Sequence, residues 1–151
     1  MRGSSNTCLC FTTASLKLQG YVAADFVGEI NSRKSTTGFV FTLGGTAISW
    51  ASNVQKIVTL STIEAEYVAA TKTGKEMIWL HGFLDVLGKK QEIGILHNDN
   101  QSAIFVTKNS AFHSKSKHIQ TKYHLIHYLV EDKLVILEKI CGSKNLVRHV
   151  D

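Results

Sequence analysis

Hydrophobic and polar residues alternate along the first third of the chain, and this period of two is typical of half-buried β-strands. The alternation covers LKLQGYVAADF (residues 16–26) and TTGFVFTLGGTAISWAS (36–52), in which Gly44–Gly45 marks a hairpin turn between two strands. A shorter apolar run, KIVTLS (56–61), predicts one more strand. The first third of the chain is therefore expected to form four consecutive strands.

The period changes at STIE, residues 61–64. Ser61 is expected to cap the N-terminus of a helix, and Glu64 is expected to reach back from the third helical position, which is the capping-box arrangement. The helix is expected to continue through AEYVAATKTGKEMIWLHGFLDVL (65–87).

Strands and helices alternate in the remainder of the chain. EIGILHNDN (92–100) predicts a strand that ends in polar residues, QSAIFVTKN (101–109) a short helix, and LVILEKICG (134–142) a last strand. Within SKHIQTKYHLIHYLVEDK (116–133), one helix face carries the apolar residues Ile119, Tyr123, Ile126 and Val130. NLVRHVD (145–151) resembles the first turn of a further helix. Hairpin strands followed by strand–helix alternation predict a mixed sheet with helices packed on it, an α/β architecture.

Charge changes this picture in one respect. The chain of 151 residues fits one domain and carries a formal net charge of +5. Residues 108–128 contain four lysines, four histidines and no acid. A solvated helix face usually mixes both signs, so this segment favours contact with a phosphate backbone.

Membrane and secreted classes are not expected. No apolar run approaches the roughly 18 residues of a membrane span, and the first 20 residues lack the apolar core of a secretory signal. Cys8, Cys10 and Cys141 form a sparse, odd-numbered set, which favours reduced thiols. An intracellular protein of the cytoplasm or nucleus is therefore expected, without a membrane partner.

Three acids lie where a catalytic site could form. Asp25 and Asp99 each lie at the exit of a predicted strand, and Glu66 lies in the first part of the long helix, facing inward beside Tyr67 if that helix packs on the sheet. Carboxylates that converge from strand ends and a helix suit Mg²⁺, which takes oxygen ligands. Each acid also has a simpler interpretation: Asp25 as a turn residue, Glu66 as a first-turn acid favoured by the helix dipole, and Asp99 as a helix N-cap.

Five longer motifs decide in favour of a known family. The segments GYVAADFVGEINSRKSTTGFVFTLGGTAISW, VTLSTIEAEYVAA, GKEMIWL, NDNQSAI and KNSAFHSKSKHIQTKYHLI resemble the ribonuclease H domain that closes the Pol polyprotein of copia-type plant retrotransposons. The resemblance extends from about residue 1 to about residue 148. It implies the ribonuclease H-like fold in residues 17–151, a five-stranded mixed sheet flanked by helices, with a truncated C-terminal helix. Residues 1–16 would be a lead-in segment from the upstream polyprotein.

The resemblance also implies an activity and its partners. Members of this family cut the RNA strand of RNA–DNA hybrids in a reaction that requires Mg²⁺ or Mn²⁺. Their partner in the same polyprotein is the reverse transcriptase domain. Transferred to this chain, the metal ligands would be Glu66 and Asp99, and the catalytic acids Glu66, Asp99 and Asp25.

Two positions of the family's site are altered in this chain. Ala23 stands where the family has its first acid, an essential metal ligand, and Arg148 stands where the family has its last acid. Asp25 matches the family's second acid, and it lies two residues from Ala23, about 6–7 Å along a strand. The altered positions imply weakened or absent metal binding and little or no cleavage.

Arg148 has a second interpretation. A guanidinium can bridge carboxylates, so Arg148 could replace the missing metal charge between Glu66 and Asp99 and stabilise a metal-free fold. The alternative is an exposed arginine at a frayed chain end.

Other residues are assigned by type and position. His118, His124 and His127 lack a neighbouring acid or cysteine to complete a zinc site, so they are expected at the core edge or facing phosphates. Trp50 and Trp79 are expected in the core. The residues expected to contact the backbone of the hybrid are Arg33, Lys34, Lys115, Lys117 and Lys122.

Three functions therefore remain open. The chain could be a ribonuclease H with little or no activity, a non-catalytic nucleic-acid-binding remnant of that fold, or a relic fragment without a selected role.

Overall fold

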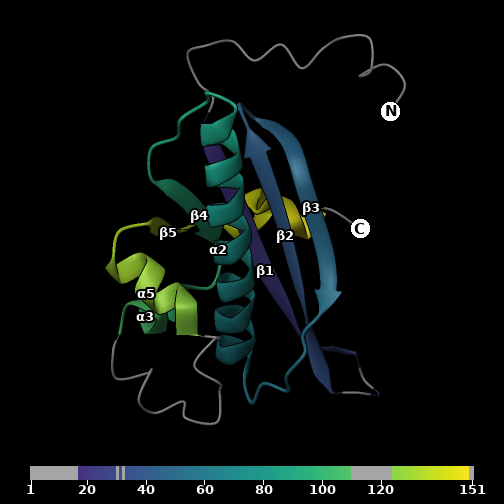
Figure 1. Ribbon diagram of the computed structural model, residues 1–151. Coiled ribbons are helices and arrows are strands. Elements are labelled where there is room, and N and C mark those ends of the chain that lie inside the picture. The colour runs from purple at the N-terminus through teal and green to yellow at the C-terminus, as the bar shows by residue number, and fades with distance from the viewer. Residues whose placement is uncertain (1–16, 30, 32, 110–123, 150–151) are drawn as a thin grey trace, which may run out of the picture.

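A five-stranded mixed sheet forms the centre of the protein (Figure 1). The computed structural model describes residues 17–29, 31, 33–109 and 124–149. The strands are β1 (Leu18–Glu29), β2 (Lys34–Leu43), β3 (Thr46–Val54), β4 (Gly94–Asn98) and β5 (Val135–Lys139), in the spatial order β3-β2-β1-β4-β5. The first three strands pair antiparallel, whereas β4 runs parallel to both β1 and β5. The predicted α/β class and five-stranded mixed sheet are confirmed.

The strand predicted for residues 56–61 does not form. This segment leads from the edge strand β3 to the start of the following helix, and it is anchored by a hydrogen bond between the Thr59 and Ser35 hydroxyl groups (3.3 Å). Two of its apolar side chains, Val58 and Leu60, are exposed. The run has the apolar composition of a strand, but no neighbouring strand edge is available for it to pair with.

The long helix α2 (Thr62–Val86) crosses the sheet and packs against β1 and β2 (Figure 1). Its predicted N-terminus is confirmed, because the Glu64 backbone N–H donates to Ser61 Oγ (3.1 Å). The Glu64 carboxylate accepts from the Leu60 backbone N–H (3.0 Å), one residue before the cap. The first bond satisfies one of the donors that every helix N-terminus leaves open, and the second ties the residue before the cap to the first turn of the helix.

Two short helices, α3 (Gln101–Lys108) and α5 (Leu125–Glu131), pack against α2 and against each other. Ile126 lies in the core and Val130 packs against it, whereas Ile119 and Tyr123 of the predicted apolar face lie outside the described residues. The chain then forms β5 and two 3₁₀ turns, η2 (Gly142–Lys144) and η3 (Leu146–His149). Figure 1 shows these turns behind the sheet, and η3 contacts β1 and β2.

Close packing between α2 and the sheet depends on Gly20 in β1. A Cβ atom at this position would lie within 2.9 Å of side-chain atoms of Phe41, Leu96 and Met77. These neighbours belong to the buried core, so any side chain at position 20 would separate the helix from the sheet.

The expectation of two core tryptophans is wrong. Trp50 is 60% exposed on the edge strand β3, and Trp79 is 63% exposed on the outer side of α2, where it stacks on Phe83. No element among the described residues covers these positions. Size and hydrophobicity predicted burial, but the position of each residue on its element decides exposure.

The two described histidines of the predicted group are core residues. His124 Nδ1 shares a 2.8 Å hydrogen bond with the Tyr67 hydroxyl, and His127 Nδ1 bonds the Thr107 carbonyl at 2.7 Å. His118 lies outside the described residues. Within the described part of the chain, no group of three or more His, Cys, Asp or Glu side chains could hold a metal ion.

No helix in the described ranges is long and apolar enough to span a membrane.

Candidate active site

An open depression of about 570 Å³ lies where β1, β4, the start of α2 and the C-terminal turns meet. We call it the arginine depression. Its lining residues are Ala24, Thr62, Glu66, Asp99, Asn100, Gln101, Ser102, Gly142 and Arg148. The structure therefore brings together two of the predicted acids and the arginine that replaces a third.

Glu66 forms the buried side of the depression, since its side chain is only 2% exposed. Burial raises its pKa to about 7, against the lowering effects of a backbone hydrogen bond with Ala24 and of the Arg148 charge. The Asn98 side-chain amide donates to Glu66 Oε2 at 3.4 Å. The inward orientation predicted for Glu66 is confirmed, since the residue is 1% exposed.

Asp99 occupies the rim of the depression directly after β4. It does not cap helix α3, because Asn100 does so by accepting the Ala103 backbone N–H (2.9 Å). Burial acts to raise the pKa of Asp99, but hydrogen bonds from Arg148, the charge of Arg148 and a hydrogen bond from Asn145 outweigh it and lower the pKa. The same depression therefore holds one carboxyl group with a raised pKa and one with a lowered pKa.

Arg148 bridges these two acids. Its Nε and Nη2 atoms donate to Asp99 at 2.9 and 3.0 Å, and Nη2 also donates to Glu66 Oε1 at 3.5 Å. The bond pair to Asp99 is bidentate, the strongest geometry available to a guanidinium. The hypothesis that Arg148 connects the carboxylates is confirmed as geometry; the arginine is exposed, as the alternative expected, but its guanidinium is bonded to both acids.

Two contacts hold the turn that carries Arg148. Asn145 is fully buried, and its side-chain amide donates to the Val22 carbonyl of β1 at 3.1 Å, while its Oδ1 accepts the Val147 backbone N–H at 3.2 Å. Val147 packs on Gly38 of β2, where a Cβ atom would lie 2.8 Å from Val147 Cγ1. The amide and the glycine thus fix the position of the guanidinium.

Ala23 and Asp25 lie beside the arginine depression. Both line a neighbouring hollow of about 410 Å³, which also includes Val147 and Arg148. Ala23 is buried and Asp25 is exposed. Asp25 interacts with Arg148 through its charge, which contributes to raising the arginine pKa, but it does not join Glu66 and Asp99.

The residues present do not fit the divalent cation that the fold family implies. Both remaining carboxylates are bonded to a guanidinium, and burial raises the pKa of Glu66 to about 7. A cation would have to displace Arg148 or lie beside it. At about 4 Å and a dielectric constant of about 20, two like unit charges repel by about 4 kcal/mol.

The predicted nucleic-acid contacts are only partly described. Arg33 and Lys34 lie at the turn into β2, where Arg33 is exposed and has a positive φ of 58°. Neither lines the arginine depression. Lys115, Lys117 and Lys122 lie outside the described residues.

The sequence alone did not identify the amide residues of the site. Asn98 orients Glu66, and Asn145 holds the turn that carries Arg148. The polar end of the 92–100 strand and the Asn of NLVR were visible, but the contacts of both residues join segments distant in sequence. Only the strand order brings these segments together.

Solved structures define the class of fold. Over 87% of this chain and 89% of the other, LC11-RNase H1 from compost superposes with a TM-score of 0.55 at 16% identity. The foamy viral protease-reverse transcriptase in complex with dsDNA superposes over 90% of this chain and 91% of the other, with a TM-score of 0.51 at 14% identity. The protein therefore has the ribonuclease H-like fold.

Sequence relatives define the origin. No family model matches the chain. The Pol polyprotein of transposon TNT 1-94 from Nicotiana tabacum is 50% identical over 145 residues, which is 96% of this chain and 11% of that protein. The Pol polyprotein of transposon RE1 from Arabidopsis thaliana is 37% identical over 118 residues, 78% of this chain and 8% of that protein. The chain is thus a retrotransposon ribonuclease H-like domain, homologous to one segment of copia-type plant Pol polyproteins, and it spans about a tenth of the length of these relatives.

Proposed function

We propose that this domain binds nucleic acid through a ribonuclease H-like fold and cleaves RNA–DNA hybrids weakly or not at all. The single observation that carries the proposal is the Arg148 guanidinium, bonded to Asp99 twice and to Glu66 once in the depression where a metal would have to bind. An internal cation in that position neutralises the carboxylates that would attract an external one.

Nucleic-acid binding is supported by charge and by homology. The net charge of +5 favours a polyanionic partner because phosphate neutralisation releases counterions. The relatives are retrovirus-related Pol polyproteins, and one structural neighbour is a viral protease-reverse transcriptase in complex with dsDNA. An RNA–DNA hybrid is the partner that this context favours, with a reverse transcriptase domain as the polyprotein neighbour.

A weakly active ribonuclease H is the second candidate. Glu66 and Asp99 are both present and lie in one depression, as a metal-dependent hydrolase requires. Ala23 and Arg148 oppose this candidate, because the first lacks a ligand atom and the second carries the wrong charge.

The test restores the two altered positions. The Ala23→Asp/Arg148→Asp variant is compared with the wild type in cleavage of a labelled RNA–DNA hybrid with Mg²⁺ or Mn²⁺. We expect the variant to cleave at least about 100-fold faster, since correct placement of catalytic groups is worth such factors. The matched control is Ala23→Asp/Lys144→Asp, which makes the same change in charge at an exposed lysine of η2.

The outcomes separate the candidates. Metal-dependent cleavage by the wild type at the rate of the restored variant overturns the proposal in favour of an active enzyme. Cleavage by the control at that same rate shows that Arg148 does not block the site. Failure of the wild type to bind the hybrid in a salt-sensitive manner overturns the binding function.

A further inference from the structure

β3 forms one edge of the sheet, and within the described part of the chain no strand pairs with its outer side (Figure 1). Its inner side pairs antiparallel with β2, and the long helix α2 packs against β1, β2 and β4. The backbone N–H and C=O groups on the outer side of an edge strand have no partner in their own sheet. Such a row of groups can pair with a strand of another chain.

The sequence of β3 lacks most of the features that protect an edge. Short length, charged side chains, proline and β-bulges all hinder pairing with a further strand. The other edge strand, β5, has five residues and ends in Glu138 and Lys139. β3 has nine residues, TAISWASNV, without charge or proline, and its bulge lies near its start, where the register shifts between Phe41 and Thr42 of β2. Residues 49–54, which follow the bulge, form a regular and uncharged stretch that we call the β3 edge.

One hydrogen bond shows which residues of the β3 edge direct their backbone groups outward. The Gln55 backbone N–H donates to the Ser35 carbonyl at 2.8 Å, so Gln55 points towards β2. In an antiparallel pair, successive residues turn their N–H and C=O groups alternately towards and away from the partner strand. Counting back from Gln55 therefore gives Val54, Ser52 and Trp50 as the residues whose backbone groups point outward. Trp50 and Val54 also expose 60% and 50% of their surface.

These three residues are symmetric about Ser52, so the β3 edge is complementary to itself. When two copies pair antiparallel around a two-fold axis at Ser52, Ser52 lies opposite Ser52, and Trp50 lies opposite Val54 of the other copy. Each of these residue pairs exchanges two backbone hydrogen bonds. Aromatic and β-branched side chains pair favourably across strands, and no like charges face each other because the strand is uncharged. The contact uses both β3 edges, so it closes at a dimer.

We propose that the β3 edge is a self-association surface, on which a second copy of this chain pairs antiparallel about Ser52 and continues the sheet. A strand of another protein would need its own complement to Trp50 and Val54, which a second copy already provides. Residues 49–54 are far fewer than the roughly 20–30 residues a side of a stable interface, so we expect a weak dimer with a dissociation constant on the order of 10–100 µM. This association requires neither nucleic acid nor the arginine depression.

Sedimentation equilibrium of the full chain without nucleic acid tests the association. From about 1 to about 500 µM protein, we expect the average mass to rise from the 16.7 kDa of the monomer towards that of a dimer and no further. Higher salt should strengthen the dimer, because screening reduces the repulsion between two chains of net charge +5. A monomer at every concentration overturns the proposal and leaves the edge to a strand of another protein. Species larger than a dimer, or a dimer that salt weakens, overturn it as well.

Ser52→Pro separates strand pairing from contact between exposed side chains. Proline removes the outward N–H of residue 52 but no hydrogen bond to β2, and edge strands tolerate proline at such positions. Trp50 and Val54 stay in place, yet we expect the dissociation constant to rise at least about 10-fold, because two of the backbone hydrogen bonds at the axis are lost. Ser52→Lys places two like charges opposite each other and should have the same effect.

Ile136→Lys is the matched control. It adds the same charge at a residue of the other edge strand, β5, that is 40% exposed, and it should dimerise like the wild type. An equal loss of dimer in this control overturns the β3 edge as the surface. Wild-type dimerisation by either Ser52 variant, with a wild-type circular dichroism spectrum, overturns it too.

Trp50 provides a signal from the surface itself. The chain has two tryptophans, so Trp79→Phe leaves Trp50 as the only one. We expect its fluorescence emission to shift to shorter wavelength as the protein concentration passes through the dissociation constant, because Val54 of the other copy then covers the indole ring. Emission that stays constant while sedimentation shows a dimer places the contact elsewhere and overturns the proposal.

Discussion

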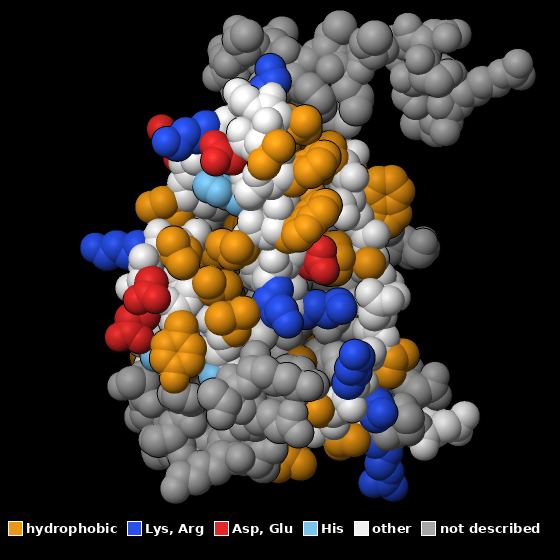
Figure 2. Space-filling view, viewed as in Figure 1, with side chains coloured by type: hydrophobic (Ala, Val, Ile, Leu, Met, Phe, Trp, Pro, Cys, Tyr) orange, Lys and Arg blue, Asp and Glu red, His pale blue; other side chains and the backbone are white. Residues whose placement is uncertain are grey.

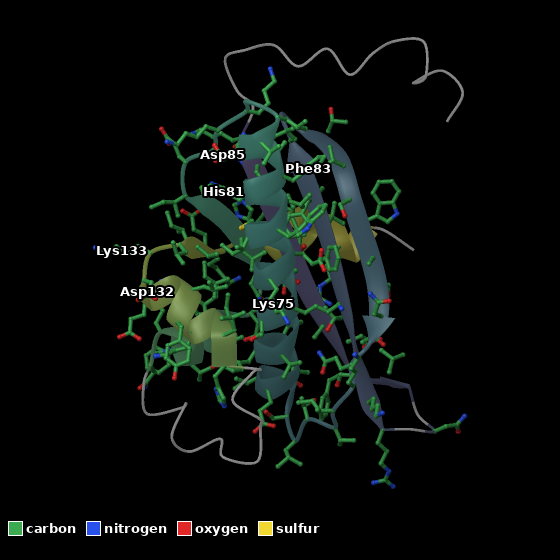
Figure 3. All side chains as sticks on the ribbon, viewed as in Figure 1. Lys75, His81, Phe83, Asp85, Asp132 and Lys133 are labelled. Carbon is green, nitrogen blue, oxygen red and sulfur yellow. The ribbon has the colours of Figure 1, made fainter. Side chains whose placement is uncertain are left out.

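The arginine depression and the lysine groove flank the same helix, but they differ in whether their polar groups are bonded within the chain. The lysine groove is a depression of about 490 Å³ along α2, on the side that faces β2 and β3, and Lys56, Lys72, Lys75 and Glu76 are among the residues that line it. Figure 2 shows Lys and Arg side chains following one another from the middle of α2 towards the lower end of the sheet. Figure 3 shows Lys75 on the middle of α2, in front of the strands.

The two regions differ in their ion pairs. In the arginine depression, Glu66 and Asp99 are bonded to Arg148 from within the chain. In the lysine groove, the three lysines form no ion pair with another described residue.

This difference concerns how each region responds to a further charge. A site whose charges already cancel gains little from a further ion, because binding would first break the existing bonds. The three lysines keep their charge unpaired among the described residues, and exposed charges of one sign add to the long-range attraction of a polyanion. Under the proposed function, the carboxylates of the arginine depression are already paired with Arg148 and offer little attraction to a metal ion.

The largest effect is expected from the ionisation of Glu66. Its pKa is about 7 in the folded protein against an ordinary value of 4.5, so the folded state holds the proton more tightly. The resulting stability is fully present below pH 4.5 and is lost as the pH rises through 7. The loss in the free energy of unfolding is on the order of 3 kcal/mol.

Urea denaturation at a series of pH values measures this loss. The Glu66→Gln variant should show a flatter stability profile between pH 4.5 and 7 than the wild type, because the amide does not ionise. Glu76→Gln is the control for replacing a glutamate of α2 by glutamine. A Glu66→Gln profile parallel to the wild type would show that burial does not govern this carboxyl group.

The next effect is expected from removing the internal cation. Arg148→Ala leaves Glu66 buried without its positive partner and Asp99 without its bidentate donor. Because the arginine is 40% exposed, we discount the full cost of a broken buried pair to about 2 kcal/mol. The melting temperature in EDTA should fall by about 4–8 °C.

Two further variants make this result specific. Arg148→Lys keeps the charge without the planar fork and should fall between the wild type and Arg148→Ala. Lys144→Ala removes an exposed charge from the preceding turn and should leave the melting temperature unchanged. If Arg148→Ala melts at the wild-type temperature in EDTA, the bridge does not stabilise the fold.

The sequence pattern correctly predicted those elements that depend on residues close to each other in the chain. The hairpin around Gly44–Gly45, the helix cap at Ser61 and the inward orientation of Glu66 depend on neighbours a few residues away, and all three are present. The 56–61 strand failed because its apolar composition resembles a strand while its position between β3 and α2 provides no pairing edge.

Long-range contacts could not be predicted in the same way. Asn145 bonds Val22 across 123 positions of sequence, and Gly38 accommodates Val147, so both depend on the placement of the C-terminal turn over β1 and β2. The position of Arg148 was predicted from a family motif, but the residues that hold it there were not. A polar residue or a glycine gives no indication in sequence of which distant segment it contacts.

A smaller effect is expected at Gly38. This position tests whether the packing of Val147 on Gly38 holds Arg148 in place. In Gly38→Ala the new Cβ would lie 2.8 Å from Val147 Cγ1, so the turn must shift. We expect a loss of about 1 kcal/mol in the free energy of unfolding, at the low end for overpacking. Gly82→Ala is the comparison: its Cβ meets no atom within 4 Å and it lies inside α2, so it should stabilise the protein by up to about 1 kcal/mol.

A double variant tests whether the effects of Gly38→Ala and Arg148→Ala depend on each other. If the shifted turn weakens the guanidinium bonds, Gly38→Ala and Arg148→Ala should cost less together than the sum of their separate effects. Strict additivity would mean that the guanidinium keeps its bonds when the turn moves.

The smallest effect is expected in the lysine groove, and it completes the contrast with the arginine depression. Lys72→Gln/Lys75→Gln removes exposed charges that form no ion pair with a described residue, so the free energy of unfolding should change by less than about 0.5 kcal/mol. Any effect on the proposed nucleic-acid binding should appear only with ligand, because RNA at about 100 times its dissociation constant stabilises a folded protein by about 2.7 kcal/mol. Thermal melts with and without single-stranded RNA measure both quantities. A variant that is destabilised without RNA would show that these lysines stabilise the fold. Charges on both sides of α2 would then contribute to the stability of the protein.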